Sequence, residues 1–165
     1  IYMEAIVRPV SWKDWPDAAK PIFKVFRSSE GEEMILKKNL FVEAVLPGSI
    51  LRKLTEEEME EYRRPFVLPE HRLPMLKWPR EIPIDGEPKD VAKVVSEYAE
   101  WLSESDIPKL FIDGDPGAIL IGKQRDFCRS WPNQKEIKVS GSHFVQEDSP
   151  HEIGEAISEW MKDIK

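Results

Sequence analysis

The chain has 165 residues, the length of one protein domain, with 41% hydrophobic and 33% charged residues. These residue types are interleaved, which indicates a folded globular protein and excludes a disordered tail. A net charge of −7, with Lys and Arg scattered among acids, argues against nucleic-acid binding, which needs a basic face. No apolar run approaches the roughly 20 residues of a membrane span. We therefore expect no membrane segment and no signal peptide.

Cysteine and histidine usage limits the chemistry. The single cysteine, Cys128, excludes an internal disulfide and occupies an apolar position of a predicted helix. We expect it to pack as a small hydrophobic residue in a reducing, cytoplasmic compartment. Because one cysteine and three scattered histidines cannot assemble a metal cluster, we expect neither a metal nor another cofactor.

The first residues predict a buried strand. Residues 1–7 are apolar except for Glu4, as in a short strand covered on both faces of a parallel sheet. A carboxylate there needs a partner, which could be an imidazole or Arg8. Since the sequence begins directly on this strand, we expect it to start inside a domain.

Residues 9–85 predict an all-helical block. Three helices are expected, over 12–27, from 29 towards 41, and from 55 to 64. Pro21 predicts a kink or break in the first, and the patterns Ser29–Glu32 and Thr55–Glu58 are capping signals for the others. Residues 65–83 are predicted to be a proline-rich connector.

After Gly86 the pattern alternates between helix and strand. We expect, in order, a helix over 89–103, a strand over 108–113, a turn over 113–117, a helix before 131, a strand over 137–139 and a closing helix from 149. This order is typical of the later part of a parallel α/β sheet. Because two or three strands alone form a poor sheet, the remaining strands are expected from polypeptide outside this sequence.

His143 and Glu4 are the candidate chemical pair. His143 follows a predicted strand in a glycine-containing loop, at the carboxyl end where α/β sheets bind ligands. Local sequence alone favours a structural histidine, and an ion pair with Arg8 is the structural alternative for Glu4. The functional interpretation gains from complementarity, because a histidine base needs a carboxylate to fix its tautomer and both residues lie at strand ends.

Other polar and aromatic residues receive structural interpretations. Asp113 and Asp115 also follow a strand and could orient the histidine instead, but their Asp-Gly and Asp-Pro-Gly contexts predict solvated turn residues. His71 and His151 are predicted to be solvated. The default expectation for the helical block is a core containing Trp12, Phe23, Phe41, Met75 and Trp78.

Six strings run in order along nearly the whole chain: Tyr-Met-Glu-Ala (2–5), Phe-Val-Glu-Ala-Val-Leu-Pro (41–47), Tyr-Arg-Arg-Pro-Phe (62–66), Trp-Pro-Arg-Glu-Ile-Pro-Ile (78–84), Asp-Phe-Cys-Arg-Ser-Trp-Pro-Asn-Gln (126–134) and Gly-Ser-His-Phe-Val-Gln-Glu-Asp-Ser-Pro (141–150). Together they resemble haloalkane dehalogenases of the subfamily whose catalytic acid is glutamate. The resemblance implies an α/β fold, the C-terminal part of an α/β-hydrolase with a helical cap. Residues 1–8 would be a core strand, 9–85 the cap and 86–165 the C-terminal part of the core.

The resemblance also implies roles. His143 would be the general base and Glu4 its orienting acid, in a family where an aspartate first displaces halide and a histidine-activated water then hydrolyses the alkyl ester. The halide leaves towards N–H groups of a tryptophan and an asparagine. Those three family residues precede the strand at which this sequence begins, and neither Asp113 nor Asp115 replaces the nucleophile. The implied partners are therefore a small haloalkane, water, halide and an N-terminal half that carries the nucleophilic aspartate.

By position, the resemblance implies an apolar cavity suited to small haloalkanes. Its expected lining is Phe23, Phe41, Val45, Ala118, Ile119 and Phe144. Weaker candidates for an entrance tunnel are Pro74, Met75 and Trp78.

Three alternatives remain open. A coelenterazine-oxidising luciferase of the Renilla type has similar strings, although those at 114–119 and 126–129 favour a dehalogenase. A second alternative is an inactive fragment or interaction module. An epoxide hydrolase is weaker, because it needs ring-opening tyrosines from the cap and Tyr62 is the only obvious one.

Overall fold

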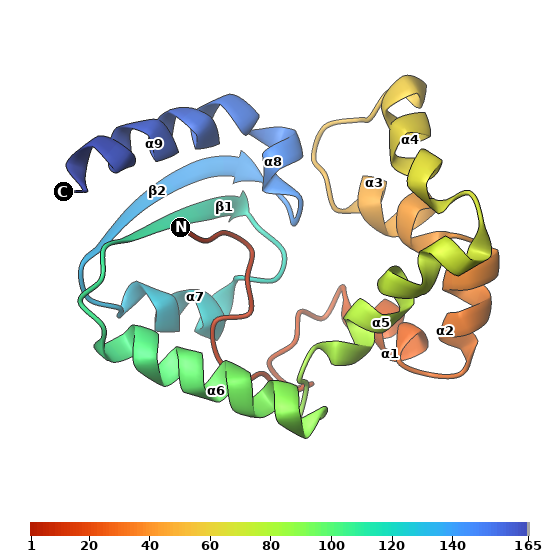
Figure 1. Ribbon diagram of the computed structural model, residues 1–165, viewed down its shortest axis with the longest axis horizontal. Coiled ribbons are helices and arrows are strands. Elements are labelled where there is room, and N and C mark those ends of the chain that lie inside the picture. The colour runs from red at the N-terminus through yellow and green to blue at the C-terminus, as the bar shows by residue number, and fades with distance from the viewer. Residues whose placement is uncertain (165) are drawn as a thin grey trace.

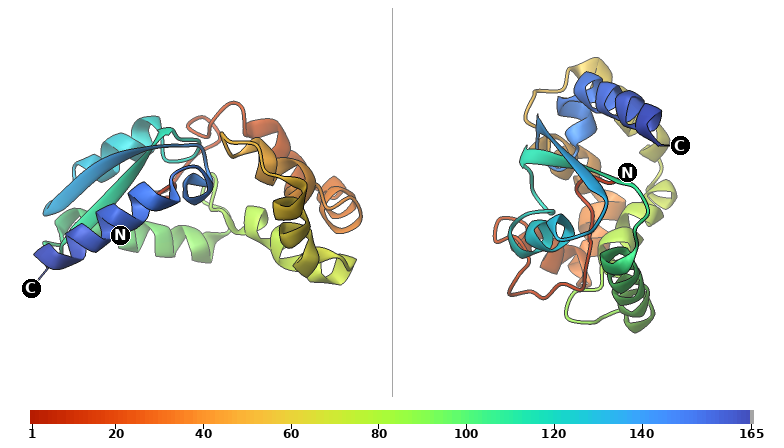
Figure 2. Two further views of the ribbon diagram at one scale, coloured as in Figure 1. Left: turned by 90° about the horizontal axis from the view of Figure 1, so that it is seen from above. Right: turned by 90° about the vertical axis from the view of Figure 1, so that its left-hand side faces the viewer.

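The computed structural model describes residues 1–164, so Lys165, the last residue of the predicted core segment, lies outside the described residues. An α/β part and a helical block occupy opposite ends of the long axis (Figures 1 and 2). The helical block holds α1 to α5, and the α/β part holds both strands and α6 to α9. No helix within residues 1–164 is both long and apolar enough to cross a membrane.

A parallel strand pair forms the centre of the α/β part. β1 (Lys109–Pro116) runs in register with β2 (Gln134–Gly141), and α7 (Gly122–Arg129) connects them. Both strands are longer than predicted, but the predicted alternation of helix and strand is confirmed. The first six residues of β1 are all buried, as expected of a strand covered on both faces.

Helices cover the two faces of this sheet. On one face α8 (Val145–Asp148) and α9 (Pro150–Asp163) pack on the sheet, with an apolar cluster of Leu110, Ile112, Val139, Val145, Ile153 and Trp160. On the opposite face lie α7 and α6 (Lys89–Glu104), where the cluster contains Val7, Phe111, Leu120, Cys128 and Trp131 (Figure 1). Cys128 is fully buried and unpaired, as the sequence predicted.

The predicted strand over residues 1–7 is wrong. Only Tyr2 pairs with the sheet: its N–H donates to Leu110 O (3.0 Å), and its carbonyl accepts from Ile112 N (3.0 Å). Two residues later Glu4 adopts a φ of +40°, in the left-handed region, which turns the chain away from the ladder. The segment 1–8 therefore makes a single bridge to β1, at Tyr2, and bends at Met3 and Glu4.

The helical block consists of short helical pieces. They are α1 (Lys20–Phe26), α2 (Glu30–Glu32), the π-helical turns η1 (Glu33–Lys37) and η2 (Phe41–Val45), α3 (Leu46–Gly48), α4 (Glu56–Arg63), the 3-10 turns η3 (Arg64–Phe66) and η4 (Pro69–Arg72), and α5 (Leu73–Glu81). Their shared core contains Phe26, Ile35, Val42, Leu46, Met59 and Leu76. A smaller cluster of Val10, Trp15, Ile84 and Ile119 joins the block to the α/β part.

Three predicted boundaries in this block differ from the structure. The first helix begins only at Lys20, because Pro21 sits in its first turn and does not kink it. The second is interrupted at Asn39, whose φ of +51° breaks the helix. The predicted connector over 65–83 contains α5, in which Pro74 occupies the first turn and Pro79 is accommodated within the helix.

The two predicted capping signals have opposite outcomes. The Thr55 hydroxyl accepts from Glu58 N (3.2 Å), and the Glu58 carboxylate accepts from Thr55 N (2.7 Å), so this capping box is confirmed. Ser29 makes no side-chain cap bond, and the neighbouring Ser28 hydroxyl accepts from Glu30 N instead.

Candidate active site

Glu4 and His143, predicted as a pair, lie in contact. The Nδ1 atom of His143 is 3.2 Å from Oε2 of Glu4, although 139 residues separate them in the chain. His143 comes from the loop after β2, and Glu4 from the segment that leaves the edge of β1. The Glu4 side chain is 4% exposed and the His143 side chain is 35% exposed. A buried carboxylate thus supports an imidazole that solvent and small molecules can reach.

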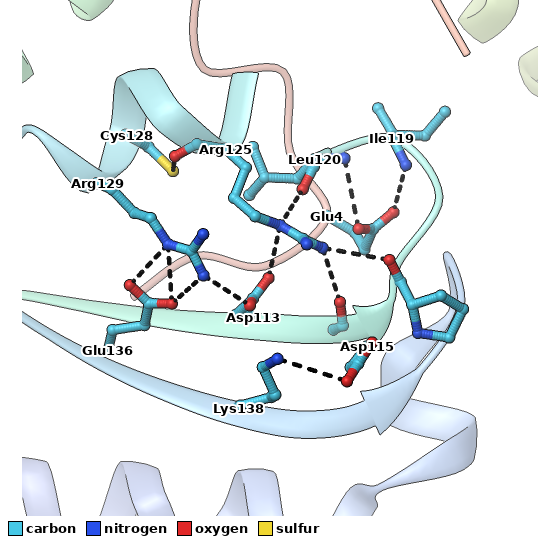
Figure 3. Close-up of polar contacts among 12 residues, drawn as sticks. Glu4, Asp113, Asp115, Ile119, Leu120, Arg125, Cys128, Arg129, Glu136 and Lys138 are labelled. Atoms are coloured by element: carbon cyan, nitrogen blue, oxygen red, sulfur yellow. Dashed lines mark hydrogen bonds and ion pairs between the residues drawn. The ribbon is translucent and has the colours of Figure 1, made fainter. Parts of the chain in front are cut away.

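Backbone amides hold the Glu4 carboxylate. Ile119 N (2.8 Å) donates to Oε2 and Leu120 N (3.4 Å) donates to Oε1 (Figure 3). Ala118 N also donates to Oε2 (3.1 Å). These donors compensate for the loss of hydration around a buried charge. Arg8, the structural alternative as a partner for Glu4, lies instead over the Phe127 ring, 5.9 Å from its centroid.

The turn that carries these amides requires glycine at residue 117. Gly117 has a φ of +70°, and a Cβ there would lie 2.9 Å from both Glu4 Oε1 and Gly114 O. Glu4 itself is a non-glycine residue with positive φ. Backbone strain of this kind persists where the surroundings fix a conformation, and it concentrates at functional sites.

The loop that carries His143 is tied to the helical block. The Asp148 carboxylate accepts from Ser142 N (3.1 Å) on one side and from Leu51 N (2.9 Å) and Arg52 N (3.0 Å) on the other. The sequence analysis missed this contact, because nothing local to Asp148 indicates a partner about a hundred residues away. Asp148 therefore fixes the position of the loop before His143 relative to the helical block.

Two apolar hollows meet at His143. The first, of about 310 Å³, contains Glu4 and His143 and is walled mainly by the aromatic side chains Trp15, Phe23, Phe41, Trp78 and Phe144. The second, of about 630 Å³, shares Phe23, Phe41, Ile119 and His143 and extends to Val45 and Ala118. All six side chains expected to line a cavity border one of these hollows.

The other aromatic and methionine candidates lie at different places around the first hollow. Trp15, which the sequence analysis did not select, is 2% exposed and lines the first hollow. Trp78 lines this hollow too, and it is 72% exposed. Pro74 and Met75 border a separate depression beside Trp78.

The predicted turn at 113–117 is wrong, and of its two aspartates only Asp115 is solvated as predicted. β1 continues through Pro116, and Asp113 is 1% exposed, between Arg125 Nε (2.9 Å) and Arg129 Nη2 (3.0 Å) of α7 (Figure 3). Burial raises the pKa of Asp113, and the two guanidinium groups oppose this rise. Asp115 is exposed, with Lys138 at 3.4 Å. Neither aspartate contacts His143.

The remaining candidates lie away from the hollows. His71 and His151 are exposed, as predicted. The Tyr62 hydroxyl donates to Glu147, and burial raises the pKa of Tyr62 to about 12. Tyr62 borders neither hollow, which removes the residue on which the epoxide-hydrolase alternative depends. Among residues 1–164, no three His, Cys, Asp or Glu side chains converge to hold a metal ion.

The chain is similar in sequence and in structure to known haloalkane dehalogenases. The chain is 56% identical over 165 residues to a haloalkane dehalogenase of Sphingobium indicum, an alignment that covers 99% of the chain and 56% of that relative. The chain is homologous to the C-terminal part of haloalkane dehalogenases. It thus spans little more than half the length of this relative. No protein-family model matches the chain.

Two further matches bear on the fold and on the luciferase alternative. The crystal structure of a putative ancestral haloalkane dehalogenase superposes with a TM-score of 0.90 at 46% identity, covering 98% of this chain and 58% of that one. The observed sheet and helices are therefore the C-terminal part of an α/β-hydrolase fold. A coelenterazine h 2-monooxygenase of Renilla reniformis is 41% identical, covering 99% of this chain and 53% of that relative.

Proposed function

We propose that this chain forms the base-bearing part of a haloalkane dehalogenase, which converts a haloalkane and water into an alcohol and a halide. Glu4 is the orienting acid and His143 the general base. One observation carries the proposal: the Glu4–His143 contact lies at an apolar hollow large enough for a small haloalkane. The sequence identity to dehalogenases supports it independently.

The proposed chemistry of this chain is activation of water in the second of two steps. With Nδ1–H donating to Glu4, the Nε2 atom of His143 has a free lone pair. It takes a proton from water while the water oxygen attacks the carbonyl carbon of an alkyl–aspartyl ester. The ester C–O bond then breaks, and the imidazolium returns its proton to the leaving oxygen to give the alcohol. The second proton of the water leaves the new carboxyl group for solvent, which regenerates the aspartate. Glu4 stabilises the imidazolium that forms in between.

The ester-forming aspartate is proposed to come from an N-terminal part of the same fold, which also supplies the donors for the halide. Among the described aspartates, Asp113 is buried between two arginines and Asp115 is exposed, so neither is placed to attack a substrate. We assign residues 9–85 as the cap, 1–8 and 86–165 as core, and a cytoplasmic location compatible with the reduced Cys128.

The test is a His143→Phe variant in the polypeptide that joins this chain to the N-terminal part. Ester formation should proceed and hydrolysis should stop, so mass spectrometry should find the aspartate alkylated after one turnover. His151→Phe, at an exposed histidine, is the matched control and should turn over normally. A His143→Phe variant with no trapped ester would reject His143 as the water-activating base.

A luciferase is the second candidate, because the Renilla monooxygenase also covers the chain. The higher identity to the Sphingobium dehalogenase favours halide chemistry. Parallel assays of halide release from haloalkanes and of light from coelenterazine separate the two. Neither product from the joined polypeptide would support the third alternative, an inactive module.

A further inference from the structure

Arg125 of α7 brackets the loop that holds Glu4. Its Nη2 donates to Gly114 O (2.9 Å) and Pro116 O (3.2 Å), and its Nε donates to Leu120 O (3.1 Å). One planar guanidinium therefore joins the end of β1 to the far side of the loop (Figure 3). The three amides that donate to Glu4 lie at 118–120, within the loop that these bonds close.

Arg125 also places a positive charge behind the carboxylate. A Cβ on Gly117 would lie 2.8 Å from Arg125 Nη2 and 2.9 Å from Glu4 Oε1, so the two groups face each other across this glycine. The Arg125 side chain is 18% exposed, which weakens the screening of its charge by water. Arg125 thus supports Glu4 both through the loop backbone and through its charge.

Arg125 is itself held in place by Asp113. The Asp113 Oδ1 atom lies 2.9 Å from Arg125 Nε, while Oδ2 accepts from Arg129 Nη2 (3.0 Å). Arg129 continues to Glu136 on β2 and donates to no carbonyl of the loop among the described contacts. The two arginines, one helical turn apart, therefore share Asp113 but only Arg125 reaches the loop.

We propose that Arg125 is a positioning residue for the water-activating pair: by closing the 114–120 loop it fixes the amides that hold Glu4, and Glu4 in turn fixes the His143 ring. The kinetic consequence rests on the proposed dehalogenase function. The structural consequence, the hydrogen bond between His143 Nδ1 and Glu4, does not.

The structural test is proton NMR of the joined polypeptide with ¹⁵N-labelled histidine. The His143 Nδ1 proton should give a low-field signal that disappears in His143→Phe. Arg125→Gln should lose or displace this signal, while the matched control Arg129→Gln should keep it. Arg125→Lys, which retains a charge near Asp113 without the fork, should fold if Arg125→Gln does not, and should weaken the signal. An unchanged signal in the folded Arg125 variants would overturn the inference.

The kinetic test follows the alkyl ester by rapid quench. Arg125→Lys should slow ester hydrolysis by about 10- to 100-fold, as expected for a misplaced base, and leave ester formation nearly unchanged. Arg129→Gln should alter neither step. The two proposals can fail separately. If the Arg125 variants lose the NMR signal but the unsubstituted joined polypeptide releases no halide, the positioning role of Arg125 is supported and the dehalogenase proposal is rejected. A retained NMR signal, or equal slowing of both steps, would reject the role of Arg125.

Discussion

The α/β part and the helical block hold their charges in opposite ways. In the α/β part Asp113 and Glu4 are almost completely buried: Asp113 forms ion pairs with two guanidinium groups, and Glu4 accepts hydrogen bonds from backbone amides. In the helical block Arg63 pairs with Glu43, Glu56 and Glu60 at the surface, where water competes for every contact. Buried charges fix the geometry around the candidate site, whereas stability of the block depends mainly on its apolar core.

The largest effect is expected at Asp113. Asp113→Ala leaves Arg125 without its buried counter-charge, so the free energy of unfolding should fall by about 3–5 kcal/mol. Urea unfolding of the joined polypeptide measures this loss. Asp115→Ala, two residues along the same strand but exposed, should cost no more than about 0.5 kcal/mol. Similar losses of unfolding free energy in the two variants would contradict the expected difference between a buried and an exposed charge.

A smaller effect is expected at the capping box of α4. Thr55→Ala removes the hydroxyl that accepts from Glu58 N, and it should lower the free energy of unfolding by about 1 kcal/mol. Ser29→Ala is the control, because Ser29 makes no cap bond despite the same sequence signal. A loss at Ser29 equal to that at Thr55 would contradict the described caps.

The smallest effect is a pH dependence at the surface. The Arg52 guanidinium and the Thr55 backbone N–H lower the pKa of Glu58 from 4.5 to about 2. Since this acid is stronger in the folded chain, its contribution is present above pH 4.5 and is lost as the pH falls towards 2. Glu58→Gln should therefore be less stable than the wild type at neutral pH and equal to it near pH 2, as measured by urea unfolding across this range. Glu57→Gln, at a side chain without an ion pair among the described contacts, is the control and should lose less stability at neutral pH.

Sequence patterns predicted what depends on local chemistry. Helical periodicity located α6 and α9, and the pattern at Thr55 located the start of α4. The Glu4–His143 pair was predicted from the need of a histidine base for a carboxylate and from the family resemblance, although Glu4 was placed on a strand that the structure does not form. Residues that depend on unusual backbone, such as Glu4 and Asn39 with positive φ, were placed in regular elements, because neither has a side chain that demands that conformation.

Contacts between distant segments could not be predicted from local patterns. Asp113 was assigned to a turn because Asp-Gly is a turn signal, yet the two arginines of α7, four residues apart, provide the partners that allow its burial. Two arginines four residues apart, on a helix that packs on this strand, were the available sequence signal that Asp113 could be buried. Asp148 offered none, since its partners at 51 and 52 come from the helical block.

Halide release by a Glu4→Gln variant tests most directly whether the hydrogen bond between Glu4 and His143 is needed to activate water. A stopped-flow measurement on the joined polypeptide should show one equivalent of halide per enzyme released at nearly the wild-type rate. Turnover after this burst should be slower by about 10²- to 10⁴-fold, because the base has lost its orienting acid. Continued turnover at the wild-type rate would contradict the account.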